Sequence, residues 1–424
     1  MHNEPKYEQE ANAKRNDLEN LINETENTFN NALHDKNTLK TPSVNGQTAC
    51  ITFVGNTFVS IARNMESESG SIPLKRCKDD CLTIGTHSGT FHADEVLACF
   101  MLKQLTEYES AKILRSRDNV ELQKNCSIIV DVGSEFDHDR KLYDHHQKSF
   151  QETLSTLRPE LGDKYQIRLS SAGLIYNYYG ESIIDNILKK HGVELSDENL
   201  RLTYIQVYRS FISEIDAIDN GVPLCPDGQE PLYKISTNIS ARVSRLNLSW
   251  DDETGDCQED RFLQAMCAVG KEFVERVLYI GKSWIKAREY VRNALQNATK
   301  VHETGEILLL KRLCPWKQHL FDLEQECNIE GRTKLVIFED TQDGTWRVAG
   351  VPVTPDSFLG RQFLPEEWRG LKNENLSQTV GIDDLLFAHS TGFMGGAKAR
   401  EAALAMAIKS LQWPRKAETK TQCR

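Results

Sequence analysis

Four groups of imidazole and carboxylate side chains occur between residues 86 and 221 of this sequence. They are His87, His92 and Asp94; Asp131; Asp144, His145 and His146; and Asp216 with Asp219. Mixed nitrogen and oxygen donors suit Mn²⁺, Zn²⁺ or Fe²⁺, whereas Mg²⁺ usually takes oxygen donors. Two such ions can share and activate a water and hold both oxygens of an in-line displacement at phosphorus. The residue types therefore predict a two-metal phosphoesterase, with two Mn²⁺ favoured and Mg²⁺ as the alternative.

Each group taken alone also has a simpler explanation. A histidine and an aspartate in a loop often form a capped turn, and a single aspartate after a strand can cap a loop. Asp216 and Asp219 are three residues apart in a predicted helix, where such a pair usually forms a solvated face. The metal hypothesis depends on their joint occurrence, and the sequence does not decide which of these two aspartates is a ligand.

The elements that must position these groups alternate between strand-like and helix-like stretches. Short apolar runs at residues 82–84, 111–114 and 127–132 alternate with helical patterns such as 93–105, which predicts βαβ units and a parallel sheet. Helical patterns dominate residues 170–298. A second series follows, with strands at 306–311, 335–338, 345–353 and 385–389 and a helix at 397–411. We predict an α/β protein in which a parallel-sheet catalytic domain precedes a smaller α/β substrate-binding domain, joined by helices.

These patterns divide the 424 residues into five parts. Residues 1–80 form an N-terminal extension that is largely flexible, because its first 47 residues hold few large apolar side chains. Within it, residues 50–63 are more apolar and could form a strand or a short helix. The catalytic domain spans 81–225, the helical connector 226–300, the substrate-binding domain 301–415 and a tail 416–424.

The overall composition narrows the classes of partner. Hydrophobic residues are 39% and charged residues 27%, which is typical of a soluble globular protein. A net charge of −11 disfavours a protein that binds nucleic acid over its whole surface, so a polyanion must meet a local basic groove or bound metal. The sequence shows no membrane span and no secretory leader, and its eleven cysteines include no CxxC pair. We expect an intracellular protein that is not secreted and has no membrane partner.

The second strand series offers candidate substrate contacts. His389 ends a strand-like run, and Gly395 and Gly396 precede a helix whose free N–H groups would favour an anion, with Lys398 adding positive charge. The double glycine could equally be a simple turn. Arg242 and Arg245 could donate to phosphates, or could be solvated on a surface helix.

The triplet Asp144-His145-His146 resembles the motif that names the DHH phosphoesterase superfamily. A closer resemblance, to the Myg (melanocyte proliferating gene) exonuclease family, covers Leu82 to Trp413. It rests on the strings IGTHSGTFHADEVLACFML, IIVDVG, YDHHQ, LSSAGLIY, EIDAIDNG, RVSRLNLSW and FMGGAKAREAALAMA. This resemblance implies a DHH-type fold and a metal-dependent 3′–5′ RNA exonuclease of the nucleus or mitochondrion, with the cytoplasm as an alternative.

The resemblance also implies roles for individual residues. The implied metal ligands are His87, His92, Asp94, Asp131 and His145. Asp131 would bridge two ions, His146 would face the phosphate or handle a proton, and Asp144 would orient its neighbours. In such relatives a glycine-rich segment near the C-terminus belongs to the domain that holds substrate, which favours the binding interpretation of Gly395 and Gly396.

Two other functions remain compatible with the sequence. The same site could serve a small-molecule phosphatase or pyrophosphatase, or a phosphodiesterase that cleaves oligonucleotides or dinucleotides. A third possibility is a non-catalytic scaffold that has kept the fold and its metals. A degenerate relative would be expected to lose some of these side chains, because buried unpaired carboxylates and imidazoles are costly without a metal. The expected partner is single-stranded RNA, with DNA as a second substrate, and the sequence leaves the oligomeric state open.

Overall fold

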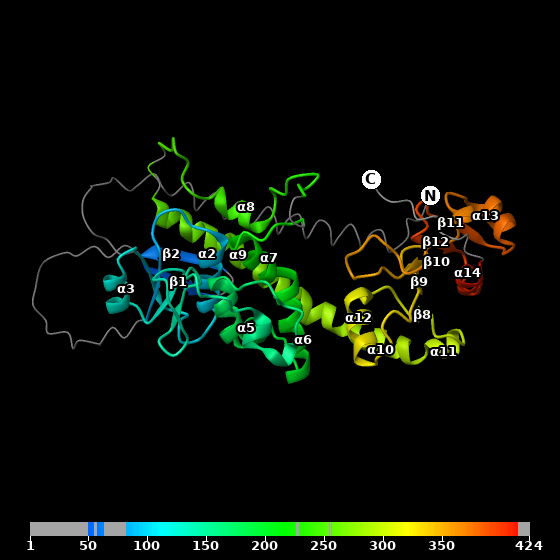
Figure 1. Ribbon diagram of the computed structural model, residues 1–424, viewed down its shortest axis with the longest axis horizontal. Coiled ribbons are helices and arrows are strands. Elements are labelled where there is room, and N and C mark those ends of the chain that lie inside the picture. The colour runs from blue at the N-terminus through cyan, green and yellow to red at the C-terminus, as the bar shows by residue number, and fades with distance from the viewer. Residues whose placement is uncertain are drawn as a thin grey trace, which may run out of the picture. The chain divides into compact units, whose positions relative to one another are not determined.

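A computed structural model describes residues 50–54, 57–62, 82–225, 229–253, 255 and 257–413 (Figure 1). The chain divides into two compact units between Pro73 and Leu74. In the first unit, β1 (Cys50–Val54) pairs with β2 (Thr57–Ala62) in antiparallel fashion, so this segment forms strands and not a helix. The rest of the predicted extension 1–80 and the predicted tail 416–424 lie outside the described residues. The predicted divisions near residues 225 and 300 fall within the second unit and stay predictions.

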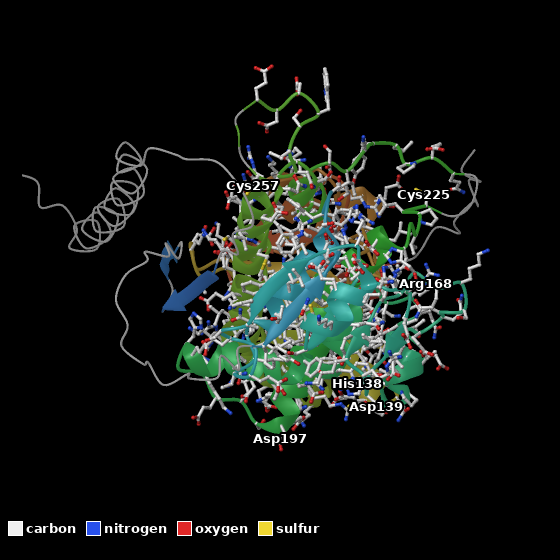
Figure 2. The ribbon with its side chains drawn as sticks, turned by 90° about the vertical axis from the view of Figure 1, so that its left-hand side faces the viewer. His138, Asp139, Arg168, Asp197, Cys225 and Cys257 are labelled. Carbon is white, nitrogen blue, oxygen red and sulfur yellow. The ribbon has the colours of Figure 1, made fainter. Side chains whose placement is uncertain are left out.

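The first sheet of the second unit has the strand order β4-β3-β5-β7-β6. Its strands are β3 (Thr83–Thr86), β4 (Lys112–Arg115), β5 (Ile128–Val130), β6 (Phe136–Asp137) and β7 (Leu142–Tyr143). Four of them are parallel, and β6 alone runs antiparallel to β7. The turn between β6 and β7 carries His138 and Asp139 (Figure 2). Helices α2 (Ala93–Leu102) and α3 (Asn119–Asn125) follow β3 and β4, so the predicted βαβ units are present.

Helices dominate the chain from residue 154 to residue 301. They are α4 (Leu154–Leu157), η2 (Pro159–Leu161), α5 (Ser171–Lys190), α6 (Asp197–Val207), η3 (Tyr208–Ile212), α7 (Ser213–Asp219), α8 (Ile239–Ser244), α9 (Gln258–Tyr279), η4 (Ile280–Trp284), α10 (Ile285–Gln296) and α11 (Ala298–Val301). The short segments η3 and η4 are π-helical and continue the helices that flank them.

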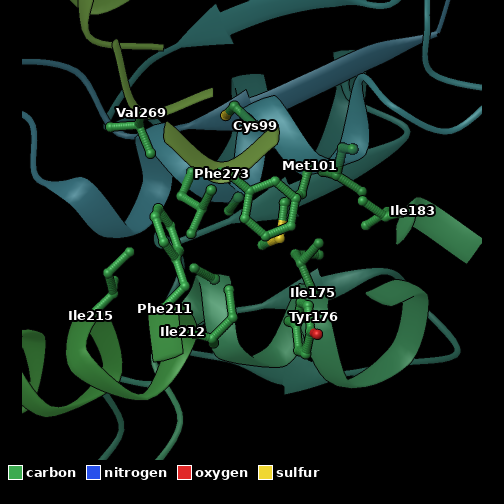
Figure 3. Close-up of a cluster of buried hydrophobic side chains, with 14 of the residues drawn as sticks. Cys99, Met101, Ile175, Tyr176, Ile183, Phe211, Ile212, Ile215, Val269 and Phe273 are labelled. Atoms are coloured by element: carbon green, nitrogen blue, oxygen red, sulfur yellow. The ribbon is translucent and has the colours of Figure 1, made fainter. Parts of the chain in front are cut away.

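The main core lies where α2, α5, η3, α7 and α9 pack together (Figure 3). Helix α9 shows the reason in its sequence, because its buried residues recur at helical spacing along one face. They include Phe262, Ala265, Val269, Phe273 and Val277. This packing fixes α2 and α5 against each other, and both helices begin at the carboxyl edge of the first sheet.

The second sheet has the order β11-β12-β10-β9-β8. Its strands are β8 (Ile307–Leu310), β9 (Leu335–Glu339), β10 (Trp346–Gly350), β11 (Leu385–Ala388) and β12 (Met394–Ala397). The accompanying helices are α12 (Trp316–Glu326), η5 (Glu366–Trp368), α13 (Asn373–Val380) and α14 (Arg400–Gln412). Only β8 and β9 pair in parallel.

Helices cover both faces of this second sheet, because successive side chains of β9 belong alternately to two different cores. Leu335 and Ile337 belong to a core that includes residues of α13 and α14, whereas Val336 and Phe338 belong to one that includes residues of α10 and α12. The predicted fold class is confirmed: the protein is mixed α/β, and the described part of its second unit has two five-stranded sheets, the first of them mostly parallel. Among the described helices, none combines the length and apolar character needed to span a bilayer.

Candidate metal centre and active site

The carboxyl edge of the first sheet brings together residues from distant parts of the sequence. His87 follows β3, Asp131 follows β5 and His145 follows β7, and these three strands are parallel neighbours. Asp94 lies in the first turn of α2, and Asp219 ends α7. Because parallel strands end at one edge, the strand-end residues meet there, and the two helices add their carboxylates.

The first group of donor atoms consists of His87, His92, Glu95 and Asp131, whose donors all lie within 4.8 Å of one another. His87 Nε2 lies 3.1 Å from Glu95 Oε1 and 3.5 Å from Asp131 Oδ2. His87, Glu95 and Asp131 are buried, whereas His92 is exposed and its ring centroid lies 5.9 Å from that of His87. This set of two imidazoles and two carboxylates can hold a divalent cation.

Two further groups surround His145. Its Nε2 lies 2.9 Å from Asp219 Oδ2, 3.5 Å from Asp131 Oδ1 and 3.7 Å from Asp94 Oδ2. Asp94, His145 and Asp219 form one possible cation group, and Asp131, His145 and His146 form another. Asp131 thus faces His87 with one carboxylate oxygen and His145 with the other.

The backbone at Asp131 adopts a conformation that few residue types accept. Its φ is 57°, and Gly133 and Ser134 follow with φ of 108° and 55°. Aspartate and asparagine tolerate this left-handed region better than most residues do. Strained backbone of this kind is often held in place at functional sites, and here it ends β5 and turns the Asp131 carboxylate toward both histidines.

The amino terminus of α5 holds the carboxylate of Asp94. Ser171 N donates to Asp94 Oδ2 at 3.0 Å, and Ala172 N donates to Asp94 Oδ1. Ser171 Oγ also donates to Asp131 Oδ1 at 3.3 Å. Free N–H groups and the helix dipole favour a negative charge at this position, so α5 orients two of the candidate ligands.

Proximity of acids and imidazoles shifts the pKa values across the centre. Burial lowers the pKa of His87, but the carboxylates of Asp131 and Glu95 outweigh it and raise this pKa to about 10. Burial also lowers the pKa of His145, but the carboxylates of Asp131 and Asp219 outweigh it and raise this pKa to about 11. Burial and the charges of Asp131 and Asp219 raise the pKa of Asp94 well above its usual range. Crowded acids of this kind are what a cation would neutralise.

The buried atoms of His145 test whether a metal fits here. Neither ring nitrogen has a hydrogen bond of good geometry, although the side chain is only 3% exposed. A buried polar group without a partner is costly, and a coordinated cation would satisfy it. The donor set, the crowded carboxylates and the buried imidazole without a well-aligned hydrogen bond together fit divalent metal ions.

The structure separates the two aspartates that the sequence left undecided. Asp219 is half-buried and lies beside His145, whereas Asp216 is fully buried and accepts hydrogen bonds from Ser170 N at 2.9 Å and Ser170 Oγ at 2.8 Å. A side chain on Gly173 would collide with the Asp216 carboxylate, which explains the glycine. Within the described residues, the possible cation groups include Asp219 and omit Asp216.

Substitution at these two positions tests that separation. Asp219→Asn should weaken Mn²⁺ binding by at least the 10–100-fold known for lost partners of metal ligands, with little change in melting temperature. Asp216→Ala should instead lower the free energy of unfolding by about 2–3 kcal/mol, because Ser170 would be left with buried unpaired groups. Calorimetric metal titration and thermal denaturation of both variants check this. A larger loss of metal affinity in Asp216→Ala than in Asp219→Asn would reverse the assignment.

His146 and Asp144 form a pair at the rim of the centre. Asp144 Oδ1 lies 2.7 Å from His146 Nδ1 and also accepts from His146 N, while Asp144 Oδ2 accepts from Ser134 N. Asp144 is buried, but the His146 side chain is 59% exposed. The hydrogen bond with Asp144 raises the pKa of His146, against the opposing effect of partial burial. Asp144 therefore orients an exposed imidazole whose remaining nitrogen, Nε2, is available to another group.

The predicted substrate contacts lie on other elements. Arg242 on α8 and the adjacent Arg245 are exposed, and Arg245 Nη1 donates to Ser236 O. His389 is exposed just after β11, with Nδ1 2.9 Å from Thr391 Oγ1, and Lys398 pairs with Asp384. Their role in substrate binding stays a prediction.

Gly395 and Gly396 have a packing explanation that the sequence did not suggest. Both lie in β12, which pairs with β10 on one side and β11 on the other. A side chain on Gly395 would meet Met406, and one on Gly396 would meet Phe387. The next helix, α14, begins only at Arg400. The structure thus accounts for these glycines without a phosphate, and their contact with substrate also stays a prediction.

Sequence reasoning overlooked Glu95 and Ser171. Glu95 is fully buried, and its carboxylate accepts from His92 N at 2.9 Å and 3.1 Å while lying near His87. Its position three residues after His92 at a helix start was a usable signal. Ser171 left only the weaker signal of two serines before an apolar helical run, so its contacts with Asp94 and Asp131 required the fold.

Comparison with known proteins gives the family. The MYG1 exonuclease model, described as "Uncharacterised protein family (UPF0160)", matches residues 83–411. A MYG1 protein of Dictyostelium discoideum is 47% identical over 331 residues, covering 78% of this chain and 96% of that relative. Proteins called MYG1 exonuclease in Rattus norvegicus and Homo sapiens are each 44% identical, covering 80% of this chain and 88% and 89% of theirs. Since the match contains every residue of the three cation groups, the chain that carries this centre belongs to the MYG1 exonuclease family.

Proposed function

We propose that this protein is a metal-dependent 3′–5′ exonuclease that hydrolyses phosphodiester bonds of single-stranded RNA. One observation carries the proposal: the two oxygens of Asp131 face different histidines, each at 3.5 Å, inside two adjoining donor groups. A carboxylate in this position can bridge two cations. We favour Mn²⁺ over Mg²⁺, because each group includes imidazole nitrogen.

The metal ions, when bound, supply an activated water and stabilise charge at phosphorus. His87, His92, Glu95 and Asp131 would hold one ion, and Asp94, His145 and Asp219 the other, with Asp131 shared. His146 would act on the substrate itself. Held by Asp144 through Nδ1 and with a raised pKa, it can offer a proton from Nε2 to a phosphate oxygen or to the leaving 3′ oxygen.

A nucleic acid is the substrate class that the names of the relatives favour, and the choice of RNA rests on the family resemblance. Two of the relatives compared carry the name exonuclease. Because the net charge is −11, a polyanion would bind only at a local basic groove or at bound metal. Exposed cationic side chains such as Arg242 could contact its phosphates. Location in the nucleus or mitochondrion rests on family resemblance and stays a prediction.

The assay that tests this function uses single-stranded RNA labelled at its 5′ end and purified protein with Mn²⁺. We expect a ladder of labelled fragments that shorten progressively from the 3′ end, and no hydrolysis after chelation. His145→Gln should abolish the ladder, while His302→Gln, at a half-buried histidine outside the three donor groups, should leave it intact.

Parallel reactions distinguish the other functions. Intact RNA together with cleavage of pyrophosphate or dinucleotides would identify a small-molecule phosphoesterase on the same centre. Equal behaviour of wild type, His145→Gln and metal-free protein on all of these substrates would refute catalysis by this centre.

A further inference from the structure

The loop from His87 to His92 carries two imidazoles of the first donor group, and it is held mainly by side chains from elsewhere. Four of its carbonyl oxygens accept hydrogen bonds from residues at the end of β4, just after α8 and at the start of α9. The pairs are Arg115 Nε to His87 O at 3.2 Å, Arg117 Nε to Ser88 O at 3.0 Å, Arg115 Nη2 to Gly89 O at 2.6 Å, Gln258 Nε2 to Gly89 O at 3.2 Å and Asn247 Nδ2 to Phe91 O at 2.9 Å.

Asn247 makes the most complete of these contacts. Its Oδ1 accepts from Phe91 N at 2.9 Å while its Nδ2 donates to Phe91 O, so one amide satisfies both backbone groups of a residue 156 positions away. Gln258 Nε2 donates to the same Oδ1 at 2.6 Å. The amide places an acceptor and a donor on separate atoms of one planar group, which neither alanine nor an ionised aspartate can reproduce.

Phe91, the residue to which Asn247 forms both hydrogen bonds, directly precedes His92. Phe91 is fully buried, and its ring packs edge-on against Phe262 of α9 with centroids 5.7 Å apart. His92 is exposed and is the N-cap of α2, where its backbone N donates to the Glu95 carboxylate at 2.9 Å and 3.1 Å. The backbone of His92 is therefore held from two sides, by Glu95 at its own N–H and by Asn247 through the preceding Phe91, and both contacts set where its imidazole points.

Asn247 lies just after α8, in the segment between α7 and α9, whose contacts with the main core include the fully buried Val243. Cys225 and Cys257 lie near the two ends of this segment (Figure 2), which begins after Asp219 and returns to the centre at Asn247. Trp250, three residues further on, is 96% exposed. The contact with Phe91 thus ties the residues after α8 directly to the loop before α2, beside the attachment that Val243 provides in the core.

We propose that Asn247, supported by Gln258, is a positioning residue for the first metal site: it holds the loop so that His92 can join His87, Glu95 and Asp131. This inference rests on the metal centre of the proposed function and does not depend on the substrate. Partners that orient metal ligands typically contribute 10–100-fold to metal affinity. The second donor group, with Asp94, His145 and Asp219, has its own supports at α5 and α7 and should be affected less.

The test is calorimetric titration of the full-length, metal-free protein with Mn²⁺ in the absence of RNA. Wild type should bind two ions in resolvable steps. Asn247→Ala should weaken one step by roughly 10–100-fold and leave the other near its original value. The Mn²⁺ affinity of Asn247→Asp at that step should lie between those of wild type and Asn247→Ala, because its carboxylate can still accept from Phe91 N but cannot donate to Phe91 O.

Asn238→Ala is the matched control. Asn238 caps α8 through a hydrogen bond from Ala241 N at 2.8 Å, in the same segment but without contact to the loop. It should bind Mn²⁺ as wild type does, and thermal denaturation of each metal-free variant verifies that all are folded. Wild-type affinity in Asn247→Ala, or equal losses in Asn238→Ala, would overturn the inference. If wild type itself binds no Mn²⁺, the proposed function fails instead.

Discussion

Asp131→Asn should reduce Mn²⁺-dependent RNA hydrolysis by roughly 10³-fold or more. A shared carboxylate supports both ions, and losing several kcal/mol of transition-state stabilisation, about 4 kcal/mol for example, corresponds to that factor. Asparagine is the right replacement because it accepts the left-handed backbone at φ 57° and has nearly the shape of aspartate. Single-turnover rates at saturating Mn²⁺ separate the chemical step from weaker metal binding.

The control for this variant is Asp137→Asn, in β6 of the same sheet. Its carboxylate accepts from Arg140 N at 3.1 Å and belongs to none of the three donor groups. It should retain wild-type activity, and circular dichroism should show that both variants keep the native fold. If Asp131→Asn remains within tenfold of wild type, Asp131 does not bridge catalytic ions.

Mn²⁺ affinity should rise steeply with pH, by about tenfold per pH unit for each ion between pH 6 and 8. In the metal-free protein, the pKa values of His87 and His145 are about 10 and about 11, so both imidazoles hold their proton throughout this range. An imidazole binds a metal only when that nitrogen is deprotonated, so each ion must displace a proton. Because the raised pKa values favour the protonated form, acid weakens binding and base strengthens it, up to the pKa of each group.

Calorimetry in two buffers of different ionisation enthalpy measures the protons released. We expect at least one proton per ion for wild type at pH 7, because the raised pKa of Asp94 favours release of a further proton on binding. His87→Asn should release one proton fewer in total and should lose most of its affinity at one step. Binding that is independent of pH, with the same heat in both buffers, would mean that these histidines are not ligands.

The sequence by itself determined the location of the centre. His87 and Asp131 each follow a predicted short apolar run, and parallel strands joined by βαβ connections end at one edge of a sheet. Local pattern was therefore sufficient to predict that His87 and Asp131 meet, whereas His145 reaches the same edge through the antiparallel β6 and the two-residue β7, which were not predicted. The same patterns predicted the mixed α/β architecture and the second sheet.

Only the tertiary structure decided the orientation of individual side chains and the contacts between residues that are distant in the sequence. Asp216 and Asp219 share a helix, but only packing of α7 against Ser170 and Gly173 turns one toward the core and leaves the other beside His145. Gly395 and Gly396 looked like a phosphate loop, although Met406 and Phe387 explain them by close packing. Asn247 carries no local signal at all, because its two hydrogen bonds to Phe91 span 156 residues. Residue type and spacing state which donors are present, whereas the orientation of each side chain is set by neighbours that only the folded chain supplies.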